Sequence, residues 1–111
     1  EMNNKPTRFF SSRQEKRVAK LVGGKQVPNS GAIRFGAGDV TTSRILIECK
    51  TVTKPQKTFT VKKEWIEKNQ EEAFAMGKSY SAVAIDLGDG VQHYIISQSL
   101  FNKLVDVLDN D

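Results

Sequence analysis

Residues 36–51, GAGDVTTSRILIECKT, join a glycine-rich turn to an apolar run that contains charged side chains. Because side chains alternate between the two faces of a β-strand, Ile47 and Cys49 share one face and suit a protein core. Glu48 and Lys50 share the opposite face. The run therefore predicts a strand with one apolar and one charged face, an arrangement that keeps charges out of the core, where burial is costly.

Asp39 lies at the end of the glycine-rich turn, upstream of Glu48. If the chain bends after Asp39, its strand lies beside the strand of Glu48 and the two carboxylates converge at one edge of the sheet. Carboxylate oxygens are ligands that suit Mg²⁺ and Mn²⁺, and a neighbouring lysine can orient a nucleophilic water or neutralise charge on a phosphate. The alternative is an exposed Glu48–Lys50 pair with Asp39 as an ordinary turn residue.

The chain upstream of this stretch predicts an arm, a helix and short strands. Residues 1–10 are polar, contain a proline and are expected to form a flexible N-terminal arm. Residues 11–22 predict a helix that Ser11 or Ser12 caps, with the glutamine or glutamate three residues on completing a capping box and the following glycine pair ending the helix. Short strands and turns are expected over residues 25–40. The apolar stripe of the helix consists of Val18, Leu21 and Val22.

The chain downstream alternates helices and strands, so the whole predicts one α/β domain, residues 11–111, with a central mixed β-sheet flanked by helices. The helix at 62–78 places Ile66, Ala73 and Phe74 on one face. The sequence Gly88-Asp89-Gly90 is typical of a tight hairpin. The expected elements after residue 40 are strands at 44–52 and 58–61, the helix at 62–78, strands at 81–87 and 91–97, and a helix at 99–111.

The last helix has large apolar residues along one side, which allows two interpretations. This side can pack on the sheet of its own chain, which we favour as its main role, or it can form an interface with a second copy. The residues are Leu100, Phe101, Leu104, Val105 and Leu108.

Charge is distributed unevenly along the chain. Residues 1–78 hold 16 of the 17 Lys and Arg against 8 of the 13 acids, and residues 79–111 hold one Lys against five acids, so a net charge of +4 combines a basic body with an acidic end. A basic body favours a polyanionic partner, although lysines also serve solubility.

A single cysteine excludes a disulfide framework and a cysteine-rich zinc site and favours a reducing, cytoplasmic setting. No segment reaches the ~18 apolar residues of a membrane span, and there is no signal-peptide pattern, so we expect no membrane partner.

The segments GDV and ILIECKT together resemble the core of the PD-(D/E)xK nuclease superfamily, with Gly38 where that family often has proline. Over residues 11–97, the helix, the glycine-rich segment, the charged strand and the helix after it are similar to archaeal-type Holliday-junction resolvases and their phage-encoded relatives. The resemblance implies a restriction-endonuclease-like core. It also implies a metal-dependent endonuclease that resolves four-way junctions by paired, symmetric phosphodiester hydrolysis, in a bacterial, archaeal or phage-infected cell.

The resemblance assigns roles to individual residues. Asp39 and Glu48 would be metal ligands for Mg²⁺, which Mn²⁺ can replace, and the main-chain carbonyl of Cys49 would join them. Lys50 would be the catalytic lysine. Glu15 would complete the acidic cluster from the first helix, although it also reads as a capping-box residue. Ser30 would match a serine that matters for cleavage, although it also fits an ordinary turn. No organic cofactor is implied.

Basic residues on both sides of the site are candidates for binding the phosphates of branched DNA, through contacts that are independent of sequence and sensitive to salt. Because a four-way junction has two-fold symmetry, the resemblance implies a homodimer. Two alternatives remain open, namely a flap, nicking or restriction-type enzyme on the same core, and a non-catalytic DNA-binding domain. The basic residues are Arg8, Arg13, Lys16, Arg17, Lys20, Lys25, Arg34, Lys54, Lys57, Lys62 and Lys63.

Overall fold

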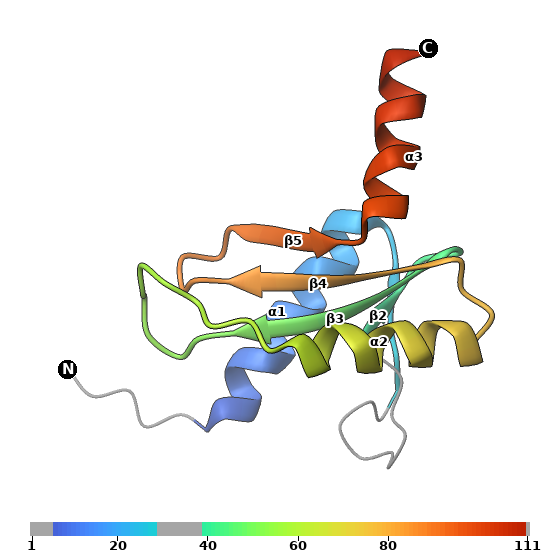
Figure 1. Ribbon diagram of the computed structural model, residues 1–111. Coiled ribbons are helices and arrows are strands. Elements are labelled where there is room, and N and C mark those ends of the chain that lie inside the picture. Colours follow the sequence, from blue (N-terminus) through green and yellow to red (C-terminus); the bar gives the residue numbers. More distant parts are fainter. Residues whose placement is uncertain (1–5, 29–38, 111) are drawn as a thin grey trace.

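Five strands form one mixed sheet in the computed structural model, which describes residues 6–28 and 39–110 (Figure 1). The strands lie in chain order, β1-β2-β3-β4-β5; β3 and β4 are parallel, and the other neighbours are antiparallel. With three helices, they make the single α/β domain that the sequence predicts. The strands are β1 (Lys25–Gln26), β2 (Val40–Thr41), β3 (Ile45–Thr51), β4 (Tyr80–Asp86) and β5 (Gln92–Ile96).

The first helix, α1 (Thr7–Val22), begins earlier than predicted. Pro6 is its N-cap, with φ −66° and no side-chain cap, so the expected arm to residue 10 and the serine caps are wrong. Proline explains the early start, since its fixed φ suits the entrance to a helix and its missing N–H is not needed in the first turn. Residues 1–5 lie outside the described residues. Gly23, with φ 67°, ends the helix as predicted.

The face of α1 that packs on the sheet differs in part from the predicted stripe. Val18 is fully buried and contacts a core that includes Ile47 and Cys49, which confirms the predicted apolar face of β3. Leu21, by contrast, is 64% exposed, and its place in the stripe was wrong. Polar Gln14 and Glu15 are buried instead, because they lie on the same side of the helix as Val18.

The second helix, α2 (Lys63–Ala75), connects β3 to the parallel strand β4 and covers the opposite face of the sheet (Figure 1). Its buried residues are Asn69 and Ala73. Phe74 is 86% exposed, contrary to prediction, because each residue turns a helix by about 100° and Phe74 has rotated off the buried face.

The strand predicted at residues 58–61 is absent from the structure; these residues join a loop that leads into α2. Phe59 packs edge-to-face against Trp65, with 6.2 Å between the ring centroids. β4 pairs with β3 along its whole length, so that side of β3 has no free edge for another strand.

The β4–β5 hairpin forms at Gly88-Asp89-Gly90 as predicted, and Gly88 and Gly90 both have positive φ. Asp86 holds the turn together: its Oδ1 accepts hydrogen bonds from the main-chain nitrogens of Gly88 at 2.8 Å and Gly90 at 3.1 Å. Asp86 is only 5% exposed, so a charged residue is fixed inside the molecule at this end of the sheet.

The last helix, α3 (Gln98–Asp109), projects away from the sheet, and the domain measures 50 × 31 × 26 Å (Figure 1). Ser97 caps it by accepting from the main-chain nitrogen of Leu100, directly after β5 ends. Of its large apolar residues only Leu100 is buried, so the expectation that α3 packs mainly on its own sheet is wrong. The chain enters α3 with no turn that would fold it back. No helix in residues 6–28 and 39–110 has the length and apolarity to cross a bilayer.

Candidate active site

Glu48 and Lys50 form an ion pair on the α2 side of β3. Glu48 Oε2 lies 3.3 Å from Lys50 Nζ, and both side chains are about a quarter exposed, at 23% and 29%. Lys50 Nζ also lies 4.5 Å from the centre of the Trp65 ring, which α2 supplies. A cation held between a carboxylate and an indole face has a restricted position. The predicted charged face of β3 therefore exists and presents a fixed lysine.

Asp39 reaches the same strand from its edge. Its main-chain nitrogen donates to the carbonyl of Ile47 at 2.8 Å, and its Oδ2 accepts from the main-chain nitrogen of Cys49 at 2.7 Å. The paired part of β2 includes only Val40 and Thr41, so the Asp39 carboxylate occupies the edge of β3 that β2 leaves uncovered. The expected bend is confirmed, and it places Asp39 beside the residue that follows Glu48.

Glu15 approaches from α1, on the other face of the sheet. It is 4% exposed, and its Oε2 lies 3.5 Å from Arg8 Nη1, a side chain that is itself 63% exposed. Burial raises the pKa of the Glu15 carboxyl, and the nearby charge of Asp39 raises it further, while Arg8 opposes both. Glu15 is therefore coupled to Asp39, as a member of an acidic cluster would be.

The pKa values connect the carboxylates from both faces of the sheet. Burial raises the pKa of Glu48 to about 7, the charge of Asp39 adds to the effect, and Lys50 opposes it. The Cys49 thiol, buried in the core, has its pKa raised by burial and then by the charges of Asp39, Glu15 and Glu48. Asp39 is common to all these shifts, so it stands at the centre of the cluster.

The three carboxylates have the ligand chemistry that a divalent cation requires, but their side chains are not positioned to coordinate one ion together. Among the residues that the structure describes, no three acidic, histidine or cysteine side chains are placed to hold a metal ion. Glu15 contacts both Arg8 and Asp39, Asp39 accepts from a main-chain N–H and Glu48 pairs with Lys50, so each carboxylate already has partners within the chain. Carboxylate oxygens nevertheless suit Mg²⁺, and a cation would offset the burial of the Glu48 charge and the repulsion by Asp39, which together raise the Glu48 pKa.

Two predicted site residues, Ser30 and Arg34, lie outside the described residues. The other ten basic candidates are all exposed. Some already have partners: Arg8 pairs with Glu15, Arg17 lies 3.8 Å from Asp86, and Lys63 lies 3.8 Å from Glu67. The first half of α1 and the loop after β3 lie at the same end of the molecule, so cations from both can meet one ligand (Figure 1).

Sequence reasoning missed two buried amides that hold β3 and β4. Gln14 Nε2, from α1, donates to the carbonyls of Lys50 at 3.0 Å and Ala84 at 3.2 Å. Asn69 Nδ2, from α2, donates to the carbonyls of Leu46 and Ala82, each at 3.1 Å. A polar residue at a helix position that faces the core was the available signal: Gln14 lies one turn before Val18, and Asn69 one turn before Ala73.

Comparisons with protein-family models, curated proteins and solved structures find no match to this chain. The elements of the site are three coupled carboxylates, a lysine fixed by Glu48 and Trp65, and a basic surface near the ends of β3 and α1.

Proposed function

We propose that this chain is a metal-dependent endonuclease with a PD-(D/E)xK centre that resolves four-way DNA junctions. The observation that carries the proposal is the convergence of Asp39, Glu48 and Lys50 at the uncovered edge of β3. The coupling of Glu15 to Asp39 supports a larger acidic cluster. The mixed sheet with α1 and α2 on opposite faces is compatible with a restriction-endonuclease-like core, and the sequence resemblance supplies the junction as substrate.

In this mechanism Asp39 and Glu48 would hold one or two Mg²⁺ ions, or Mn²⁺, with Glu15 and the Cys49 carbonyl as further ligands. When bound, the metal would polarise the scissile phosphate and lower the pKa of a water. Lys50 would stabilise negative charge on the phosphate oxygens during attack, since Glu48 and Trp65 hold its ammonium in place before substrate arrives.

The test compares cleavage of a labelled four-way junction and of a linear duplex with the same sequence. Paired symmetric nicks in the junction, with the duplex spared, are expected in Mg²⁺. Glu48→Gln and Asp39→Asn should each reduce the rate by at least about 10³-fold, because metal-assisted charge stabilisation contributes several kcal/mol. Junction binding in a gel shift should persist. Glu64→Gln, which changes an exposed glutamate on α2, is the matched control and should cleave normally.

Two outcomes would redirect the proposal. Equal cutting of junction and duplex would favour a flap, nicking or restriction-type enzyme with the same centre. A chain that binds the junction but cuts nothing with Mg²⁺ or Mn²⁺ would be a non-catalytic DNA-binding domain, and the enzyme proposal would fail.

A further inference from the structure

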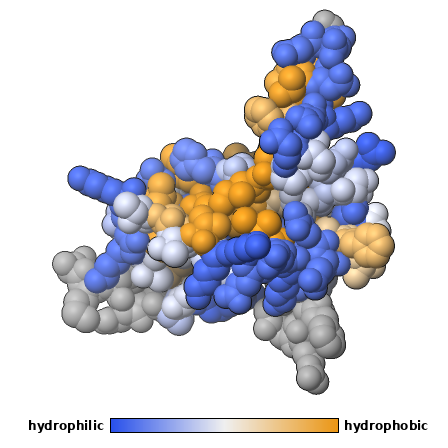
Figure 2. Space-filling view, in the orientation of Figure 1, coloured by the Kyte–Doolittle hydropathy of each residue, from blue (hydrophilic) through white to orange (hydrophobic). Residues whose placement is uncertain are grey.

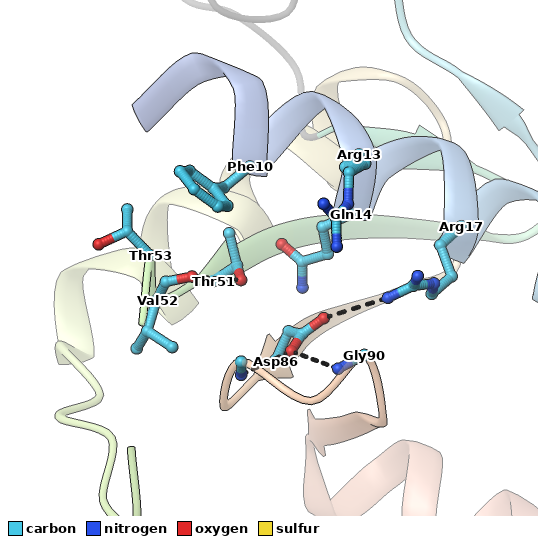
Figure 3. A pocket seen from close by; sticks show the side chains of 10 residues that line it. Phe10, Arg13, Gln14, Arg17, Thr51, Val52, Thr53, Asp86 and Gly90 are labelled. Atoms are coloured by element: carbon cyan, nitrogen blue, oxygen red, sulfur yellow. Dashed lines mark hydrogen bonds and ion pairs between the residues drawn. The ribbon is translucent and has the colours of Figure 1, made fainter. Parts of the chain in front are cut away.

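A polar cleft of about 60 Å³ lies between α1, the end of β3 and the β4–β5 hairpin (Figure 3). Thr51 and Asp86, the last residues of the parallel strands β3 and β4, both line it. Open α/β sheets bind ligands beyond the carboxyl ends of their parallel strands. The cleft therefore occupies the place in the fold where a ligand is expected, and it includes neither Lys50 nor the carboxylate cluster.

Gln14 presents a buried hydrogen-bond acceptor to this cleft. The side chain is 2% exposed, and its Nε2 donates to the carbonyls of Lys50 and Ala84 and to Gln92 Oε1. The amide cannot be reversed, because its oxygen would then face three other oxygens. Its Oε1 has no hydrogen-bond partner among the described residues. A buried acceptor without a donor is costly, so this atom favours a ligand that carries an N–H or O–H group.

Two guanidinium groups line the same cleft. Arg17 lies 3.8 Å from Asp86 Oδ2, and Arg13, an exposed residue, lies 5.5 Å over the Phe9 ring and makes no ion pair with a described carboxylate. The Asp86 charge is also met by three N–H donors from the hairpin and Gln92, so it does not repel an anion strongly. Phe10, also from α1, lies at one end of the cleft (Figure 3).

We infer that this cleft binds one unpaired nucleotide, with its phosphate on Arg13 and Arg17, its base edge donating to Gln14 Oε1 and its base face against Phe10. A phosphodiester alone has no proton for Gln14, and a base whose face contacts Phe10 cannot at the same time be stacked within a duplex. The assignment of the nucleotide to a DNA strand rests on the proposed function: an unpaired nucleotide at a branch point would then be held at the end of β3, on the face of the sheet opposite the Lys50 ammonium. The binding of the nucleotide itself does not depend on it.

The test is an NMR titration of the metal-free chain with each of the four deoxynucleoside 5′-monophosphates, with inorganic phosphate and with deoxynucleosides as comparison ligands. Saturable shifts are expected at the amides of Thr53, Gly88 and Gly90 and at the Gln14 side chain for at least one nucleotide. Arg13→Ala should weaken binding about tenfold, since it removes a charge-assisted contact. Phe10→Leu should weaken it at least about fivefold, since it removes stacking.

The matched control is Arg44→Ala, which removes an exposed arginine that does not line the cleft and should leave the affinity within about twofold. Equal affinity for inorganic phosphate would reduce the cleft to an anion site and overturn the proposal, as would the absence of saturable shifts. Because no metal and no cleavage are involved, a negative result leaves the nuclease proposal standing. Nucleotide binding without junction cleavage would support the proposal that the cleft binds a nucleotide and overturn the proposal that the chain is a nuclease.

Discussion

At the scale of single residues, Glu48 combines a costly position with a proposed role. Its side chain is 23% exposed, and burial together with the charge of Asp39 raises its pKa to about 7. Lys50 at 3.3 Å does not compensate fully, because the pKa remains raised. The charged form of Glu48 therefore lowers the stability of the folded chain. Such a carboxylate is expected at a functional site.

The raised pKa predicts how stability depends on pH. Between about pH 4.5 and 7 the folded chain holds a proton on Glu48 that the unfolded chain has lost, so this group's stabilising contribution is complete below pH 4.5 and disappears as pH rises through 7. Glu48→Gln imitates the protonated form and avoids that loss. In metal-free buffer the variant should gain stability relative to the original chain as pH rises, reaching about 2–3 kcal/mol by pH 8.

Urea unfolding of both chains at several pH values between 4 and 8.5 measures this difference. Glu64→Gln serves as control, since it makes the same change of glutamate to glutamine at an exposed position on α2. A constant difference for Glu48→Gln across the range would show that Glu48 titrates normally. Added Mg²⁺ should stabilise the original chain more than the variant, because ligand binding to the folded state adds to its stability.

At the scale of elements, the two buried amides fasten the helices to the sheet. Asn69 is 1% exposed and bridges β3 and β4 from α2. Asn69→Ala removes two hydrogen bonds and leaves a small void, so the free energy of unfolding should fall by about 2–3 kcal/mol. Gln70→Ala, its exposed neighbour on α2, should change the value by less than about 0.5 kcal/mol. Denaturant unfolding of both variants measures these changes. Equal decreases in the free energy of unfolding would mean that the Asn69 hydrogen bonds do not contribute to stability.

Local patterns predicted the strongly periodic elements and failed where tertiary packing decides. The alternation around Ile47 and the glycines of the hairpin need only neighbours in sequence, and both were confirmed. The segment at 58–61 has good strand composition, but β4 already occupies the side of β3 where it would pair. Phe74 and Leu21 have apolar side chains that the sequence alone places inside, whereas the packing angle of each helix leaves them exposed.

Only the part of the candidate site that depends on local sequence was predictable. Glu48 and Lys50 follow from strand alternation, and Asp39 from a turn that must bend. The role of Trp65 was not predictable, because its contact with Lys50 depends on how α2 crosses the strand.

At the scale of the whole molecule, apolar surface remains where no element covers it. Figure 2 shows apolar atoms over the sheet between α2 and α3 and again along one side of α3. A shallow hollow in the first area is lined by residues that include Ile66, Val83 and Ile95. On α3, Leu108 is 76% exposed. Such a projecting apolar helix face is typical of an interface with another chain.

The dimer that the proposed function requires predicts that α3 mediates it. The exposed apolar residues Phe101, Leu104, Val105 and Leu108 are spaced symmetrically about the Leu104–Val105 step, so two antiparallel copies can meet apolar against apolar around a two-fold axis. Leu104→Glu would place an unpaired charge at that axis and should weaken association by at least about 100-fold, equivalent to about 3 kcal/mol.

Light scattering after size exclusion should then show a dimer for the original chain and a monomer for the variant. Asn102→Glu, on the opposite side of α3, should remain dimeric. If the original chain is monomeric at all concentrations, or if the Leu104→Glu chain still dimerises, α3 is not the interface, and paired cutting must come from two chains that meet only on the DNA.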